Sequence, residues 1–158
     1  MAEEAARLAT VDDLAAIALI AADVAAETQD KRGGALFLRR ESGGDAALRA
    51  QALLTSTEVA GFGIIGLYDN VPFGYALVEV ETLADGGLLA RIDDLAVQSV
   101  ARGSGIGEAM MNLVLDEARE RNCFGVDSRA LPGDRETKNF FESFGLKARM
   151  LVVHRSLD

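Results

Sequence analysis

A glycine-rich turn at residues 102–107, Arg-Gly-Ser-Gly-Ile-Gly, constrains the fold of this chain more than any other segment. An apolar, strand-like run from Ile92 to Val97 precedes the turn, and a helix-like run from Ile106 to Arg121 follows it. The first N–H groups of a helix have no partner within the helix, and they lie at the positive end of its dipole. A strand, a glycine turn and a helix start therefore predict a binding site for a phosphate group.

The composition is that of a globular protein, and 158 residues most simply form one domain spanning 1–158. The net charge of −9 argues against a nucleic-acid partner, which needs a basic surface, and mildly favours a cationic substrate. The one cysteine, Cys123, cannot form an internal disulfide. We see neither a signal peptide nor an apolar run long enough to span a membrane. We therefore expect a cytoplasmic protein without a membrane partner.

The spacing of apolar residues predicts four helices, over residues 10–28, 45–54, 105–122 and 134–144. Thr10 and Asp13 form a capping box for the first helix, and Asp134 caps the last, which Gly145 ends. Runs of β-branched and aromatic residues predict strands over residues 59–68, 72–83, 88–98, 124–131 and 147–156, with a short strand before Thr10. Residues 29–44 are polar and glycine-bearing and predict a loop.

Three antiparallel strands then lead into a β-α-β crossover. This order predicts the α/β fold class, with a mixed, central six- to seven-stranded sheet and helices on both faces.

Two common phosphate sites do not fit the glycine turn. A Walker A loop needs Lys and Ser or Thr after its last glycine, but Glu108 follows Gly107. A dinucleotide-binding loop has a different glycine spacing and does not follow an antiparallel meander.

The pattern Val97-x4-Arg102-x2-Gly105-x-Gly107 resembles motif A of the GNAT acyltransferase superfamily. Residues 139–146, Asn-Phe-Phe-Glu-Ser-Phe-Gly-Leu, resemble motif B, and the order of elements matches over nearly the whole chain. The resemblance implies a GNAT acyl-CoA acyltransferase fold with acetyl-CoA as co-substrate. It implies an N-acetyltransferase that acts on a primary amine of a small molecule, peptide or protein by direct attack in a ternary complex. It also allows a homodimer.

The resemblance assigns cofactor-binding roles to particular residues. The backbone amides of one loop would cradle the pyrophosphate of CoA, and Arg102 would border it. The pantetheine arm would pair with the exposed edge of the strand at 95–97. Asp134 would line the cofactor, and Phe141 stands where the family usually has a tyrosine near the CoA sulfur. The residues of the loop and strand are Leu95, Ala96, Val97, Gly103, Ser104, Gly105, Ile106, Gly107 and Glu108.

Acyl transfer to an amine needs a group that accepts the amine proton, directly or through water. Asp93 and Asp94 are the candidates, because they lie just before the expected thioester site. Strand alternation predicts that they face opposite sides of the sheet, although a bulge could change this. Asp93 is our first candidate, because in the resembling family several amine acetylases carry a Glu at its position. Asp94 is the second.

Phe141 departs from the family pattern, since it cannot protonate the leaving thiolate as a tyrosine would. Ser128 or Tyr75 could supply a hydroxyl instead. The same departure leaves open a non-catalytic acyl-CoA-binding regulatory module as the alternative function. No group of His, Cys and carboxylate residues has metal-ligand spacing, so we predict no metal. His154, the single histidine, is expected to be structural.

Overall fold

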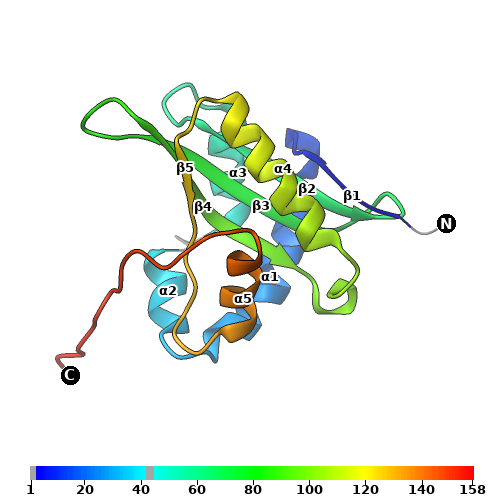
Figure 1. Ribbon diagram of the computed structural model, residues 1–158. Coiled ribbons are helices and arrows are strands. Elements are labelled where there is room, and N and C mark those ends of the chain that lie inside the picture. The colour runs from blue at the N-terminus through cyan, green and yellow to red at the C-terminus, as the bar shows by residue number, and fades with distance from the viewer. Residues whose placement is uncertain (1–2, 42–44) are drawn as a thin grey trace.

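The computed structural model describes residues 3–41 and 45–158. Its five strands form one sheet in the order β1-β2-β3-β4-β5 (Figure 1). The first four strands pair antiparallel, and β4 and β5 pair parallel. The strands are β1 (Glu4–Leu8), β2 (Gly61–Tyr68), β3 (Val71–Thr82), β4 (Leu88–Val97) and β5 (Gly125–Asp127). The mixed sheet predicted from the sequence is therefore confirmed.

Helices cover both faces of the sheet, as predicted. One face packs against α4, and α1 and α3 cover the other (Figure 1). The longest helix, α1, follows a short 3-10 turn, and a second such turn precedes the glycine loop. The helices are η1 (Val11–Asp13), α1 (Leu14–Gln29), α2 (Gly34–Arg40), α3 (Ala46–Thr55), η2 (Ser99–Ala101), α4 (Ile106–Glu120) and α5 (Arg135–Ser143).

Local sequence signals account for several of these boundaries. Thr10 and Asp13 form the predicted capping box at the start of the first helical segment. Helix α4 approaches β2 closely at Gly66, where an added Cβ would lie 2.4 Å from Cγ2 of Ile106. A glycine at this position therefore lets the helix that follows the phosphate loop seat directly on the sheet.

The predicted strand count of six to seven is wrong, because the described sheet has five strands. Residues 147–156 form no strand; they have no regular secondary structure, are exposed and lie outside the sheet. Strand β5 covers only Gly125–Asp127 rather than 124–131, because the chain leaves β4 after Asp127. A run of β-formers becomes a strand only where it finds a neighbouring strand.

The predicted loop over residues 29–44 is also partly wrong, since its middle forms helix α2. This helix is rich in strong helix formers (Ala35, Leu36, Leu38, Arg39 and Arg40) and starts after Gly33, whose φ is +77°. Residues 42–44 lie outside the described part. No helix within residues 3–41 and 45–158 is long and apolar enough to cross a membrane.

Candidate active site

A cleft opens where β4 and β5 separate. The two strands pair over only three positions, from Leu89 opposite Gly125 to Arg91 opposite Asp127. Beyond Arg91 the edge of β4 has no neighbouring strand, and a cleft of about 820 Å³ lies beside it. Helices α1, α2, α3 and α5 contribute to the walls of this cleft. The remaining walls are the turn before α4, the first residues of α4 and the segment after β5. An unpaired strand edge leaves N–H and C=O groups that need partners.

The structure brings nearly all of the predicted site residues to this one cleft. Ser104 is the exception: its hydroxyl donates to the carbonyl of Ala101, and its side chain faces a smaller hollow. The predicted residues that line the cleft are Asp93, Asp94, Leu95, Ala96, Val97, Arg102, Gly103, Gly105, Ile106, Gly107, Glu108, Asp134 and Phe141. The predicted cofactor-binding and catalytic residues are therefore neighbours in space.

The loop at the start of α4 is a set of unused hydrogen-bond donors. Within the described residues, the six backbone N–H groups from Gly103 to Glu108 donate to no protein acceptor, whereas that of Ala109 donates to Gly105. Gly103 and Gly105 have φ values of +79° and +91°, which a side chain at either position would strain. The loop thus has the donors and the backbone shape that a phosphate site requires.

Arg102 holds this loop in place with its side chain. Its Nε donates to the carbonyl of Val97 at the end of β4 (3.1 Å), and its Nη2 lies 2.8 Å from a carboxylate oxygen of Glu27 on α1. Both contacts connect the loop to neighbouring elements. The side chain therefore shapes the loop and is already paired with a carboxylate.

A β-bulge places both aspartates on one face of the sheet. Leu77 of β3 pairs with Asp94 and Val78 pairs with Ile92, so Asp93 has no partner. Ile92 and the residues after Asp94 continue to alternate: Ile92 and Leu95 pack against the core under α4, and Ala96 packs against the core under α1. The alternation prediction, that Asp93 and Asp94 face opposite sides, is thus wrong because of the bulge.

Asp94 is the more constrained of the two carboxylates. Both of its oxygens accept from the guanidinium of Arg49 on α3, at 2.9 and 2.8 Å, and Oδ2 also accepts from the hydroxyl of Tyr75 at 2.7 Å. Burial raises the pKa of the Tyr75 phenol, and the neighbouring charge of Asp94 raises that pKa further. Tyr75 therefore holds its proton and donates it to Asp94 as a hydrogen bond.

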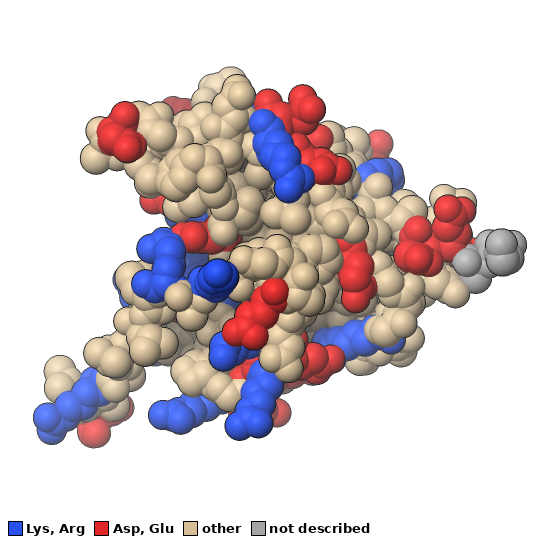
Figure 2. Space-filling view, viewed as in Figure 1, with Lys and Arg blue, Asp and Glu red and all other residues tan. Residues whose placement is uncertain are grey.

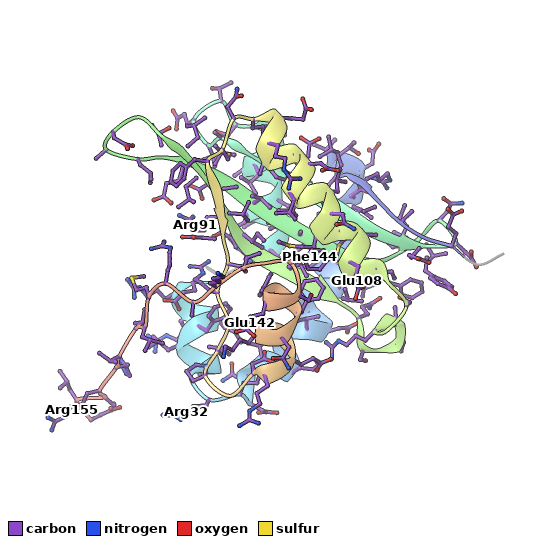
Figure 3. All side chains as sticks on the ribbon, viewed as in Figure 1. Arg32, Arg91, Glu108, Glu142, Phe144 and Arg155 are labelled. Atoms are coloured by element: carbon purple, nitrogen blue, oxygen red, sulfur yellow. The ribbon has the colours of Figure 1, made fainter. Side chains whose placement is uncertain are left out.

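Asp93 lies between two arginines that leave one of its oxygens less occupied. Its Oδ1 accepts from Nε of Arg91 at 2.7 Å and from Nη2 of Arg129 at 3.0 Å, while Oδ2 accepts only a longer bond of 3.3 Å from Arg91. Arg91 lies on β4 beside β5 (Figure 3) and also binds Glu79 and Glu81. One oxygen of Asp93 therefore remains available to a water or substrate.

Helix α5 closes the far side of the cleft. Asp134 caps the helix by accepting from the N–H of Thr137, and it also accepts from Nζ of Lys31 at 2.8 Å. Burial raises the pKa of Asp134, but hydrogen bonds from Lys31 and Thr137 outweigh it, so the net pKa is lowered. About two turns further along the helix, the ring of Phe141 is buried in the wall of the cleft and contacts Phe140 edge to face.

Sequence reasoning missed three basic residues of the site, Lys31, Arg49 and Arg129. Each lines the cleft and binds one of the predicted carboxylates. Arg49 is 45 positions from Asp94, and Arg129 is 36 positions from Asp93, so no local spacing could reveal the pairs. A carboxylate within a buried strand needs a basic partner, and this is the one signal that the sequence offered.

Comparison with known proteins decides the family. Residues 28–146 match the model of the acetyltransferase (GNAT) family, which is well over half of the chain. The chain belongs to the GNAT acetyltransferase family. This confirms the resemblance drawn from the glycine turn and from the motif that ends at Leu146.

Individual relatives of this GNAT protein are distant. It is 30% identical over 100 residues to glucosamine 6-phosphate N-acetyltransferase 1 of Oryza sativa subsp. japonica, a match that covers 63% of this chain and 56% of that protein. A mutant of a Bacillus halodurans protein shares the fold, with a TM-score of 0.79, 20% identity and coverage of 96% and 98% of the two chains.

Another structure with this fold is an aminoglycoside acetyltransferase from an uncultured soil sample, in complex with sisomicin. It has a TM-score of 0.70 and 20% identity over 98% of this chain and 95% of that one. A ribosomal-protein-alanine N-acetyltransferase of Brucella melitensis biovar Abortus 2308 has a TM-score of 0.71 and 18% identity over 98% and 100% of the two chains. At such identities these likenesses show the fold alone.

Proposed function

We propose that this protein transfers an acetyl group from acetyl-CoA to a primary amine by direct attack within a ternary complex. One observation carries the proposal: six unused amides, Gly103 to Glu108, adjoin the unpaired edge of β4 in one continuous cleft. A pyrophosphate and a peptide-like arm are the ligands that such donors and such an edge fit. The residues present therefore fit the cofactor of the family.

Residues of the cleft would divide the binding of the cofactor among them. The amides of 103–108 would hold the pyrophosphate, and the edge of β4 at Leu95 to Val97 would pair with the pantetheine arm. Asp134 and Phe141 would line the arm from α5. When bound, acetyl-CoA supplies the activated acetyl group as a thioester. An amide near Leu95 or Ala96 would donate to the thioester carbonyl and stabilise the charge that develops there.

Asp93 is the first candidate to accept the amine proton, through a water molecule. Its Oδ2 accepts one long bond only, whereas both oxygens of Asp94 are held by short bonds from Arg49 and Tyr75. We therefore assign Asp94 to positioning the strand and Asp93 to proton transfer. Ser128 lines the cleft and remains the candidate for protonating the leaving thiolate in place of the missing tyrosine. Tyr75 also lines the cleft, but its raised pKa and its hydrogen bond to Asp94 make it a poor proton donor to the thiolate.

The acceptor is proposed to be a cationic amine. Four basic side chains line the cleft against seven carboxylates, and an acidic lining attracts a protonated amine. The rice relative is named for an amino sugar phosphate, and a structural neighbour was crystallised with an aminoglycoside. The basic residues are Lys31, Arg49, Arg102 and Arg129, and the acidic ones are Glu27, Asp45, Asp93, Asp94, Glu108, Asp134 and Glu136.

The test is the release of free CoA thiol from acetyl-CoA in the presence of amines. The panel should contain amino sugars with and without phosphate, aminoglycosides, polyamines and peptides with free N-termini. We expect amine-dependent thiol release that the Asp93→Asn variant loses. The absence of release with every amine, despite measurable binding of acetyl-CoA, would contradict the proposal.

That contrary result would favour a second candidate, a regulatory module that binds acyl-CoA without transferring the acyl group. Phe141 favours this alternative, because its ring offers no proton to a leaving thiolate. The two candidates share the cofactor site and differ only in turnover. A binding measurement and a turnover measurement on the same sample therefore separate them.

A further inference from the structure

The cleft extends well beyond the phosphate loop. Helix α2 lies on the other side of α5 from the turn that begins α4 (Figure 1), and both α2 and that turn line the same cleft. The loop amides and the first residues of α5 are assigned to the cofactor, which leaves the part near α2 and α3 for the amine. We call this part the acceptor end and define it by six of its lining residues, Phe37, Asp45, Arg49, Asp93, Asp94 and Arg129.

The charges of the acceptor end are nearly balanced. Four of the seven carboxylates that line the cleft lie at the phosphate loop or at the start of α5, namely Glu27, which binds Arg102, and Glu108, Asp134 and Glu136. Three carboxylates and two arginines remain for the acceptor end. Figure 2 shows basic and acidic side chains together where the surface is hollowed between β5 and α2. Such a set of charges suits a ligand that carries both signs better than it suits a polycation.

Arg129 is held by three neighbours at this end. Its Nη2 donates to Oδ1 of Asp93 at 3.0 Å and to the carbonyl of Glu41, which caps the C-terminal end of α2, at 3.3 Å. Its guanidinium carbon lies 5.9 Å from the centre of the Phe37 ring, in a cation–π contact. The side chain is therefore oriented between β4 and α2 without the help of a ligand.

The other nitrogens of Arg129 have no protein acceptor. Nη1 donates to no group within residues 3–41 and 45–158, and Nε is buried without a hydrogen-bond partner there. Nε of Arg49 is likewise buried and unpaired in the described part of the chain. Proteins leave few buried donors unpaired, because each one costs free energy. Both arginines of the acceptor end thus have more donors than the neighbouring protein groups use.

A negatively charged oxygen group is the ligand that these donors fit. A guanidinium presents several N–H groups in one plane, an arrangement that matches a carboxylate or a phosphate. A protonated amine has donors only, so it cannot accept from Arg129 and would instead face Oδ2 of Asp93. Because Arg129 and Asp93 are in contact, a ligand that reaches both must carry its two charges close together.

We propose that the acceptor carries a carboxylate or phosphate group near its amine, and that Arg129 binds this group while Asp93 receives the amine. The inference rests on the proposed acetyl transfer and names the class of amine that the site selects. Arg129 is then a specificity-determining residue. An amine without an anionic group would leave the free donors of Arg129 unpaired when it displaces water from the acceptor end.

Calorimetric titration of matched amines into the protein saturated with CoA tests the proposal. One pair is L-leucine and L-leucinamide, which differ in a carboxylate, and the other is D-glucosamine 6-phosphate and D-glucosamine, which differ in a phosphate. We expect the anionic member of at least one pair to bind about tenfold or more tightly than its neutral partner. The pair that shows this preference distinguishes the carboxylate from the phosphate. An anionic member that binds no more tightly than its partner in both pairs would overturn the proposal.

Variants assign the preference to Arg129. Arg129→Gln should abolish it, whereas Arg129→Lys keeps the charge and should keep part of it. The matched control is Arg39→Gln, which removes the same charge from an exposed position of α2 that does not line the cleft. This control should show the full preference of the parent. A preference that Arg129→Gln leaves intact would overturn the proposal.

Thiol release with the same four compounds separates this inference from the proposed function. Release that is as fast with the neutral amines as with their anionic partners would overturn the inference and leave acetyl transfer standing. Tighter binding of an anionic amine that produces no thiol would support the inference and contradict acetyl transfer.

Discussion

Asp93 and Asp94 are adjacent in the sequence and lie on the same face of β4, because Asp93 has no partner on β3. Each carboxylate then meets a different arginine, Arg129 after β5 or Arg49 on α3. The bulge thereby gives one strand two charged groups at the mouth of the same cleft. It also gives them different environments, since only Asp93 keeps a lightly occupied oxygen.

We predict that Asp93→Asn lowers kcat roughly 10²- to 10⁴-fold, the range typical for loss of a general base. The affinity for acetyl-CoA should change little, because the phosphate loop is untouched. Steady-state kinetics and calorimetric titration measure the two quantities. The matched control is Asp127→Asn, a carboxylate that also binds an arginine but does not line the cleft. An Asp93→Asn enzyme with the kcat of the control would remove Asp93 from proton transfer.

We predict that Asp94→Ala destabilises the fold by about 3 kcal/mol. The side chain of Asp94 is only 7% exposed, and its removal leaves the guanidinium of Arg49 without its partner in a half-buried place. Urea unfolding measures the loss. Asp116→Ala is the control, because its ion pair with Arg119 is largely exposed and should change stability by less than about 0.5 kcal/mol. Equal effects of the two substitutions would contradict a structural role for Asp94.

We predict that Gly105→Glu abolishes binding of acetyl-CoA. The substitution strains a residue with φ of +91° and adds a negative charge where the pyrophosphate would lie. Gly86→Glu introduces the same side chain at a φ of +86° in a distant hairpin, and it should bind acetyl-CoA normally. Calorimetric titration of both variants makes the comparison. Undiminished affinity in Gly105→Glu would show that the loop is not the phosphate site.

We predict that Phe141→Tyr raises kcat by about tenfold or more, within the range that a positioned acid supplies. The new hydroxyl would extend from a ring that already lines the cleft. Phe144, which caps the C-terminal end of α5, does not line the cleft, so Phe144→Tyr should leave kcat unchanged. An unchanged or lower kcat for Phe141→Tyr would mean that protonation of the thiolate does not limit turnover.

The stability contributed by Asp13 should depend on pH. Hydrogen bonds from Arg7 and then from the backbone of Thr10 lower the pKa of Asp13 in the folded chain despite its burial. The contribution is therefore complete above the unfolded pKa of about 4 and is lost as the pH falls through the folded value. Urea unfolding of the parent and of Asp13→Asn should differ most near neutral pH and converge in strong acid. A difference that grows in acid would contradict this sign.

The sequence predicted those features whose signals are local. The caps at Thr10 and Asp134 and the turn at 102–107 are short patterns that act within one turn of helix, and all three are where they were expected. The six unused amides follow directly from the last of these. The mixed character of the sheet also followed, because three consecutive antiparallel strands lead into a β-α-β crossover.

The features that could not be predicted depend on partners far away in the chain. The ion pairs of Arg49 and Arg129 exist only because α3 and the segment after β5 meet β4. The bulge at Asp93 depends on the register with β3. The apolar run at 150–153 has the composition of a strand but forms none in the described structure, because composition does not say whether a neighbouring strand is there to pair with it.

The most direct test of the account is thermal unfolding with and without acetyl-CoA. At about 100 times its dissociation constant, a ligand stabilises a protein by about 2.7 kcal/mol, which raises the Tm by several degrees in a chain of this size. NADH and ATP are the controls, because the glycine loops of proteins that bind these two compounds have other spacings. The account predicts a shift with acetyl-CoA alone. The absence of any shift with acetyl-CoA, or equal shifts with all three compounds, would contradict it.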